Sequence, residues 1–234
     1  MKISEIFDLD SGKIGKIYFC SDLHYNHSNV ISFGHRPFDN VVDMNRSIMT
    51  TLRDTLKPED ILFTLGDDFW KMKEKDIIYL LDTLPTTNLY KIMGNHDKYG
   101  YYWCGGSVGK KYKFVADILD INVKYQEKVY SLVLCHYPIY DFNKMYHGGL
   151  HLFGHVHGGL DEEFETNPRL MVDIGYDGEL AKGLGSFLIS FEDIIEYFNN
   201  KTGGVDFDTW GRKKYKSSVE GYEKYDEYED IKRG

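Results

Sequence analysis

The chain has 234 residues, which is enough for one sizeable hydrophobic core and favours one domain over two. Its net charge of −9 argues against a dedicated grip on long nucleic acid, because a negative body repels phosphate unless metal ions reverse the local field. No apolar run approaches the roughly 18 residues that span a bilayer, the three cysteines have no paired spacing and the N-terminus does not resemble a secretory signal, so we expect a soluble, cytoplasmic protein.

The first hundred residues predict alternating strands and helices. Apolar runs at 3–7 and 14–20 flank a turn at 10–12, and this pattern predicts a hairpin that leads into a buried strand. Three successive units of strand, loop and helix indicate a mainly parallel sheet with right-handed crossovers. We expect the strands at 14–20, 61–65 and 89–93, and the helices at 41–56 and 77–84.

The second half of the chain contains strand-like runs but little helical pattern. Residues 99–109 have no clear period and predict a surface loop whose aromatic rings could stack on a substrate. Residues 201–234 carry eight basic and eight acidic residues, and we interpret them as a charged, Tyr-rich C-terminal extension of the 1–200 domain that could be mobile. We expect strands at 129–135, 150–153, 169–175 and 186–190, and a short helix at 192–199.

Five of the predicted strands end in side chains that can bind a metal ion. A lone histidine or Gly-Asp pair at such a place is more often structural, but the carboxyl ends of neighbouring parallel strands meet, so we expect these side chains on one edge of one sheet. Oxygen and nitrogen donors without thiolate suit Mn²⁺, iron or Zn²⁺, and their number fits two ions better than one. The side chains are those of Asp22 and His24, Asp67, Asn95 and His96, His136, and His155 and His157.

The order and spacing of these residues resemble a known signature. Its parts here are Asp22-x-His24, Gly66-Asp67, Gly94-Asn95-His96-Asp97, His136 and Gly154-His155-x-His157, and together they resemble the calcineurin-like metallophosphoesterase superfamily. Residues 22–29 and 36–38 also resemble a small bacterial and phage branch of phosphoesterases. The resemblance implies an α/β fold, a four-layer α/β/β/α sandwich of two mixed sheets.

The resemblance also implies a role for each residue of the signature. Asp22, His24 and His157 would hold one divalent ion, Asn95, His136 and His155 would hold the other, and Asp67 would bridge the two. A hydroxide between the ions would be the nucleophile. His96 would stabilise charge on the phosphoryl group or protonate the leaving oxygen, and Asp97 would orient the His96 ring.

Several neighbouring residues have open roles. Arg36 could bind phosphate with both guanidinium nitrogens or form a surface salt bridge, and His27 could line the pocket. Asp68 directly follows the candidate ligand Asp67, so we expect its side chain to point away from the site. We therefore predict that Asp68 supports a metal ligand through a hydrogen bond or forms part of the turn. Asp173 could accept a hydrogen bond from a ligand histidine, whereas His151 is interpreted as structural.

These observations predict a phosphomonoesterase or phosphodiesterase that hydrolyses a nucleotide or another small phosphoester and needs two divalent ions. The alternatives are a catalytically silent, metal-binding scaffold of the same fold and a nuclease acting on polymeric DNA or RNA. A metallo-β-lactamase type of site is disfavoured, because the compact His-x-His-x-Asp-His cluster of that class is absent. No membrane partner is expected, and the substrate, the native metal pair and the oligomeric state stay open.

Overall fold

The computed structural model describes residues 2–97, 106–166 and 168–216. These residues form ten strands and several helices within the described ranges. The strands are β1 (Lys2–Asp8), β2 (Ile17–Cys20), β3 (Ile61–Thr64), β4 (Asn88–Ile92), β5 (Phe114–Ala116), β6 (Ile118–Tyr125), β7 (Lys128–Cys135), β8 (Leu150–Phe153), β9 (Met171–Asp173) and β10 (Ile189–Ser190). The α-helices are α1 (Ser28–Phe33), α2 (Val41–Thr55), α3 (Glu74–Asp82), α5 (Asp161–Thr166), α6 (Glu179–Leu184), α7 (Phe191–Thr202) and α8 (Phe207–Lys216), with short 3₁₀ turns η1 (Leu9–Ser11), η2 (Gly109–Lys111) and η3 (Met145–His147).

The strands divide into two mixed, five-stranded sheets. One sheet has the order β10-β2-β3-β4-β5, in which β2 to β5 are parallel and β10 is antiparallel to β2. The other has the order β1-β6-β7-β8-β9, in which the β6–β7 pair is antiparallel and the remaining pairs are parallel. This arrangement confirms the mixed α/β fold with two sheets that the motif resemblance implies.

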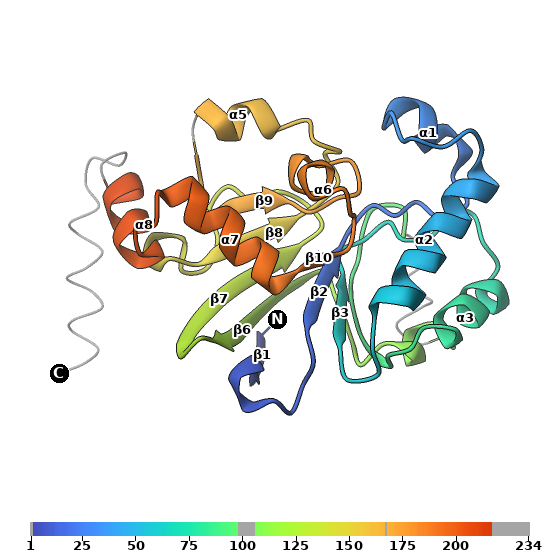
Figure 1. The fold of residues 1–234 in the computed structure, drawn as a ribbon, viewed down its shortest axis with the longest axis horizontal. Coiled ribbons are helices and arrows are strands. Elements are labelled where there is room, and N and C mark those ends of the chain that lie inside the picture. The colour runs from blue at the N-terminus through green and yellow to red at the C-terminus, as the bar shows by residue number, and fades with distance from the viewer. Residues whose placement is uncertain (1, 98–105, 167, 217–234) are drawn as a thin grey trace.

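The two sheets pack face to face around the main hydrophobic core. Phe63 and Ile92 from one sheet and Leu119 and Leu134 from the other belong to a single buried cluster. The parallel strands contribute alternate residues to each of their faces, so both faces of the first sheet must be covered. Figure 1 shows α2 and α3 on the outer side of this sheet, and a second buried cluster joins them to it. A third cluster joins the other sheet to α8 and η3.

Local sequence explains where the main helices begin. The Asn40 side chain accepts hydrogen bonds from the backbone N–H groups of Val42 and Asp43 and caps α2. Ser190 and Asp193 form a reciprocal capping box at the start of α7, which ends at Gly203 with a positive φ of 64°. The predicted helix at 192–199 is therefore present and longer on both sides.

The hairpin predicted at the N-terminus is wrong. β1 pairs with β6, where Phe7 lies opposite Val123, whereas β2 belongs to the other sheet. The turn between them connects the two sheets, and its Asp10 carboxylate accepts hydrogen bonds from the backbone N–H groups of Gln126 and Glu127. The chain thus separates two runs that the local pattern would have joined.

The described part of the predicted C-terminal extension is mainly helical. Residues 207–216, assigned to the C-terminal extension, form α8. Tyr215 on this helix is buried, and its hydroxyl oxygen accepts a hydrogen bond from the backbone N–H of Leu170. The rest of the extension, 217–234, and the aromatic part of the predicted 99–109 loop lie outside the described residues. Among the residues described, no helix is both long and apolar enough to cross a membrane.

Candidate metal centre

The residues of the predicted site converge from both sheets. Asp22, Asp67 and Asn95 follow the parallel strands β2, β3 and β4, whereas His136 and His155 follow β7 and β8 of the other sheet. The two sheets meet at this place through an isolated bridge between Ser21 and Gly175. The expectation of one edge of one sheet is therefore wrong, because the site lies where the ends of two sheets come together.

Asp22, His24 and His157 form the first group of possible ligands. Oδ1 of Asp22 lies 3.8 Å from Nε2 of His24 and 3.8 Å from Nε2 of His157. Atoms bound at about 2.0–2.2 Å to a common ion are about 3–4 Å apart. The three side chains therefore have the spacing of ligands to one ion.

Asp67, Asn95, His136 and His155 surround a second position. Oδ1 of Asn95 lies 3.0 Å from Nε2 of His136 and 2.9 Å from Nδ1 of His155. Oδ2 of Asp67 lies 3.5 Å from Nε2 of His136 and 3.9 Å from Nε2 of His24. Asp67 thus faces both groups, which is the place that a bridging carboxylate would occupy.

Unpaired buried atoms support the fit of a metal ion to the first group. Asp22 is completely buried and His24 is 2% exposed, yet Oδ1 of Asp22 and both ring nitrogens of His24 have no hydrogen-bond partner among the described residues. Leaving such atoms unpaired in the interior is costly. A bound cation would satisfy the carboxylate and imidazole together.

The protonation states of two central residues suit metal binding. Burial lowers the pKa of His24 to about 3, so its imidazole is neutral and can use a ring nitrogen as ligand. Burial alone would raise the pKa of Asp67, but the hydrogen bond and charge of His136 outweigh it and hold the pKa below the usual range. Asp67 is therefore an anion.

The backbone is strained at the same residues. Asp22, His24, Asp67, His155 and His157 all have positive φ values, between 48° and 71°. Residues other than glycine seldom adopt this region, and such residues cluster at functional sites. The positive φ values therefore mark the turns at the strand ends that carry the candidate ligands, including both His155 and His157.

Two glycines of the signature are required by close packing. A Cβ atom on Gly94 would collide with Oδ1 of Asp67 and lie 2.7 Å from the Asp67 backbone nitrogen. A Cβ atom on Gly154 would collide with Oδ2 of Asp22 and with the Ser21 hydroxyl. Gly94 does not have a positive φ, so its role is close approach rather than the sharp turn suggested by sequence.

Asp97 contacts the backbone of the site. Its Oδ2 accepts hydrogen bonds of 2.9 Å from the N–H groups of both Asp67 and Gly94, and it forms a 2.7 Å ion pair with Lys91. None of the contacts found for Asp97 within the described residues reaches the His96 ring. Asp97 therefore does not orient the His96 ring in this structure. It connects the loop that contains Asp67 to the loop that contains Gly94.

His96 lies at the solvent side of the candidate centre. Its side chain is 39% exposed, and its Nε2 lies 3.9 Å from Oδ2 of Asp67. The backbone N–H of His96 donates a hydrogen bond of 2.8 Å to Oδ1 of Asp67, and its ring packs edge-on against Trp70 with centroids 4.8 Å apart. Among the site histidines, His96 is thus both close to the bridging position and accessible to a substrate.

Arg36 does not have the phosphate-binding position that the sequence suggested. Its side chain is fully buried and forms a two-pronged ion pair with Asp177, with both nitrogen–oxygen distances 2.8 Å. The guanidinium also donates hydrogen bonds to the backbone oxygens of Asp22 and Leu23. Its guanidinium N–H groups are bonded to protein oxygens, so Arg36 supports the loop that carries the candidate ligands Asp22 and His24.

Asp177, which no sequence motif indicated, supports the candidate ligand His157. Oδ2 of Asp177 accepts a hydrogen bond of 2.7 Å from Nδ1 of His157, which leaves Nε2 of His157 facing Asp22. This role was predicted for Asp173, but the Asp173 carboxylate accepts hydrogen bonds from the backbone N–H groups of Gly158 and Gly175. No motif distinguishes the two aspartates, because only the fold brings one of them to the ring.

His27 lies beside the candidate centre, whereas His151 and Asp68 are buried. The His27 ring stacks on Trp70 at 4.1 Å and lies 5.3 Å from the His24 ring, so it borders the centre. His151 is buried, with Nδ1 bonded to the Val133 backbone oxygen, which agrees with a structural role. Asp68 is buried beneath the site and accepts a hydrogen bond from the Thr64 hydroxyl.

Comparison with known proteins agrees with this geometry. The family model for calcineurin-like phosphoesterases matches residues 15–159, and the chain belongs to this family. Family members typically bind divalent metal ions, and this chain contains candidate ligand groups. An uncharacterized protein of Methanocaldococcus jannaschii is 32% identical over 156 residues, which cover 66% of this chain and 77% of the relative. A crystal structure of a protein of unknown function from Aquifex aeolicus has a similar fold, with a TM-score of 0.55 and 24% sequence identity. The match covers 78% of this chain and 98% of the Aquifex chain, and it concerns the fold alone.

Proposed function

We propose that this protein is a phosphoester hydrolase that uses two divalent metal ions, with Mn²⁺, iron and Zn²⁺ as the candidate metals. The observation that carries the proposal is the convergence of three carboxylate or amide oxygens and four imidazoles from five strand ends, with Asp67 facing both groups. Asp22, His24 and His157 would hold one ion, and Asn95, His136 and His155 would hold the other. Paired divalent ions supply positive charge to a phosphoryl group and lower the pKa of a bound water to near neutrality.

The protein's own residues would complete the reaction. His96 is exposed at the bridging carboxylate, so it can donate a proton to the leaving oxygen or stabilise the negative phosphoryl group. Its backbone N–H bond to Asp67 fixes the loop that carries it. Asp97 would hold the backbones of Asp67 and Gly94 at a fixed separation through its hydrogen bonds to both N–H groups. The substrate would contact His96 and not Asp97.

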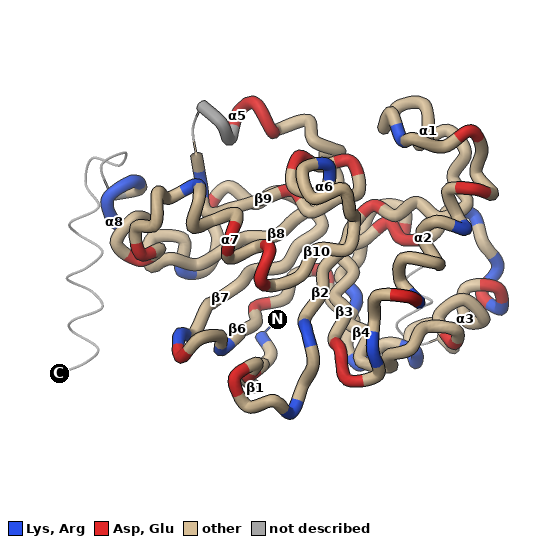
Figure 2. The backbone as a smooth tube through the Cα atoms, viewed as in Figure 1, with Lys and Arg blue, Asp and Glu red and all other residues tan. Residues whose placement is uncertain are grey.

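The substrate we propose is a small phosphoester with a flat ring, such as a nucleotide. Phe33 is 54% exposed and packs edge-on against His157, and Tyr137 is 43% exposed and packs against His155. Exposed aromatic rings beside ligand histidines offer surfaces on which a base can stack. Figure 2 shows Lys and Arg positions spread over the described backbone and interspersed with Asp and Glu, which favours a small substrate over a polymer.

Hydrolysis assays with metal-reconstituted protein test the proposal. A nitrophenyl phosphomonoester, a nitrophenyl phosphodiester, nucleotides, cyclic nucleotides and single-stranded DNA would each be assayed with Mn²⁺, Fe²⁺ and Zn²⁺. We expect metal-dependent turnover that falls by at least about 100-fold in Asp67→Asn and is unchanged in Asp54→Asn, an exposed control on α2. Bound metal without turnover on any phosphoester would instead support the catalytically silent scaffold, and preferential cleavage of DNA would support the nuclease.

A further inference from the structure

Lys91 is the one charged residue of the described strand β4, where it lies among Leu89, Tyr90 and Ile92. It lies in β4 two residues after Leu89, and alternation along the strand places both on the face that packs against α2 and α3. Its side chain is 1% exposed, and its Nζ lies 2.6 Å from Oδ2 of Asp68 and 2.7 Å from Oδ2 of Asp97. A buried ammonium without partners would be strongly unfavourable, so these two carboxylates hold it in place.

The Asp97 oxygen bound by Lys91 is also the acceptor for the site backbone. Oδ2 of Asp97 receives N–H groups from Asp67, which follows β3, and from Gly94, which follows β4. One oxygen therefore connects the lysine, the proposed bridging ligand and the loop that carries Asn95. A shift of this carboxylate would move both ligand-bearing loops.

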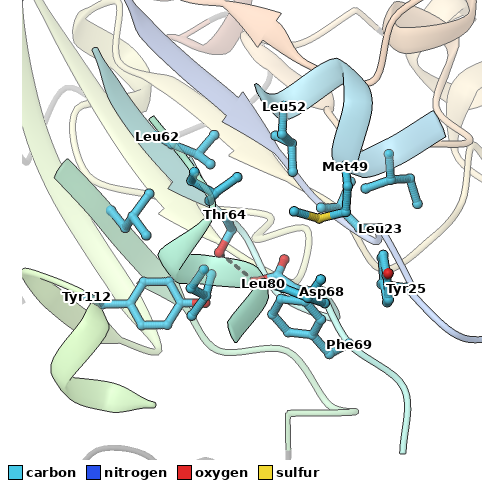
Figure 3. Close-up of a pocket in the computed structure, with 14 residues that line it drawn as sticks. Leu23, Tyr25, Met49, Leu52, Leu62, Thr64, Asp68, Phe69, Leu80 and Tyr112 are labelled. Carbon is cyan, nitrogen blue, oxygen red and sulfur yellow. Dashed lines mark hydrogen bonds between the residues drawn. The ribbon is translucent and has the colours of Figure 1, made fainter. Parts of the chain in front are cut away.

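Asp68 fixes the other side of the lysine. Its Oδ2 accepts hydrogen bonds from Nζ of Lys91 and, at 2.8 Å, from the Thr64 hydroxyl. Figure 3 shows Asp68 and Thr64 joined by this bond at a small, mostly apolar cavity of about 30 Å³, which Tyr112 also lines. The apolar walls, which include Leu62, Leu80 and Leu89, exclude most water from the network and strengthen its charged contacts.

We propose that Lys91 is a positioning residue of the metal centre, which holds Asp97 and thereby sets the separation of Asp67 and the Asn95 loop. The inference rests on the proposed two-metal function, but it concerns residues that contact neither metal nor substrate. It also explains why a lysine occupies the centre of a buried strand. Residues that orient metal ligands through hydrogen bonds typically change metal affinity by about 10–100-fold when they are replaced.

The test is the affinity of purified full-length protein for Mn²⁺, measured by isothermal titration together with the stoichiometry. Lys91→Met has a similar volume without the charge, and we expect its weakest Mn²⁺ site to bind at least about 10-fold less tightly than in the wild type. Thr86→Val is the matched control, because the buried Thr86 hydroxyl bonds to the Asp60 backbone oxygen just before β4, at the end away from the centre. The control should lose stability without a change in Mn²⁺ affinity.

A second variant keeps the test decisive if Lys91→Met does not fold. In Lys91→Met/Asp68→Asn, one positive and one negative buried charge are removed together, so the net charge of the interior is unchanged. The same loss of Mn²⁺ affinity is expected, because Asp97 still lacks its lysine partner. A folded variant that binds Mn²⁺ within threefold of the wild type would overturn the proposal. If the wild type hydrolyses no phosphoester but the variant still binds Mn²⁺ more weakly, the role of Lys91 is upheld and only the proposed function is refuted. A wild type that binds none of Mn²⁺, Fe²⁺ and Zn²⁺ would overturn both.

Discussion

The Nδ1 atom of His157 donates a 2.7 Å hydrogen bond to Oδ2 of Asp177, an aspartate that is itself held by Arg36. This bond fixes the ring so that Nε2 faces Asp22. A second partner of this kind orients metal-binding histidines in many proteins. The orientation of the first ligand group therefore depends on a residue outside the recognisable motif.

Asp177→Asn is expected to weaken metal binding at the Asp22, His24 and His157 group by about 10-fold, because the amide is a poorer acceptor for the His157 N–H. The variant also leaves Arg36 without its charged partner, so the protein will be less stable. Mn²⁺ titration well below the unfolding temperature separates the two effects. Equal affinity in the folded variant and the wild type would contradict the assigned role of Asp177, and the exposed Asp141→Asn serves as control.

Gly154→Ala is expected to destabilise the protein by about 1–3 kcal/mol, because the new methyl group collides with Asp22 and Ser21. The collision also displaces a ligand, so bound metal should decrease. Gly183→Ala is the matched change, since Gly183 lies in α6 with open space around its Cβ position. That control should be neutral or gain up to about 1 kcal/mol. Thermal unfolding with and without Mn²⁺ gives both quantities, and a harmless Gly154→Ala would refute the packing argument.

Phe33→Ala is expected to raise KM for a nucleotide by roughly 5-fold or more. KM for a substrate without a base, such as a small alkyl phosphate, should stay unchanged. A stacking contact is worth about 1–3 kcal/mol per base, and only a ring-bearing substrate can lose it. Tyr79→Ala removes a 68% exposed ring from α3 and should affect neither substrate. Equal effects of Phe33→Ala on both substrates would argue against a base-binding surface.

Stability should fall between about pH 6.5 and pH 4 because of His151. Burial lowers the pKa of this histidine to about 4, below the value of 6.5 expected in the unfolded chain. The folded state thus resists a proton that the unfolded state accepts, so the contribution is fully present above pH 6.5 and is lost as pH falls toward 4. The loss amounts to about 3 kcal/mol at 1.36 kcal/mol per pKa unit. Urea unfolding of wild type and His151→Asn at several pH values measures it, and parallel pH profiles would contradict the prediction.

Local patterns predicted those parts of the fold that depend on neighbouring residues. The strand at 150–153 and the helix beginning at Val41 match β8 and α2, since apolar periodicity and the Asn40 cap are encoded within a few positions. The N-terminal hairpin was mispredicted because the partner of β1 is β6, which lies more than a hundred residues along the chain. Pairing over that separation leaves no signal in a local pattern.

In the candidate site, too, some residues could be predicted from local sequence and others depend on contacts between distant segments. Its possible ligands could be named from the motif, because metal chemistry restricts residue type and spacing at strand ends. The supporting residues could not, since Arg36, Asp97 and Asp177 take their roles from contacts between distant segments. Lys91 did leave a sequence signal, a charge within an apolar run, but its partners become visible only when β3 and β4 lie side by side.

Anomalous diffraction from a crystal of the Mn²⁺-loaded protein tests the central claim most directly. Two manganese peaks about 3.5–4 Å apart are expected, with Asp67 between them, one peak contacting Asp22, His24 and His157 and the other contacting Asn95, His136 and His155. A single peak without Asp67 among its ligands, or no peak at these residues, would contradict the two-metal account.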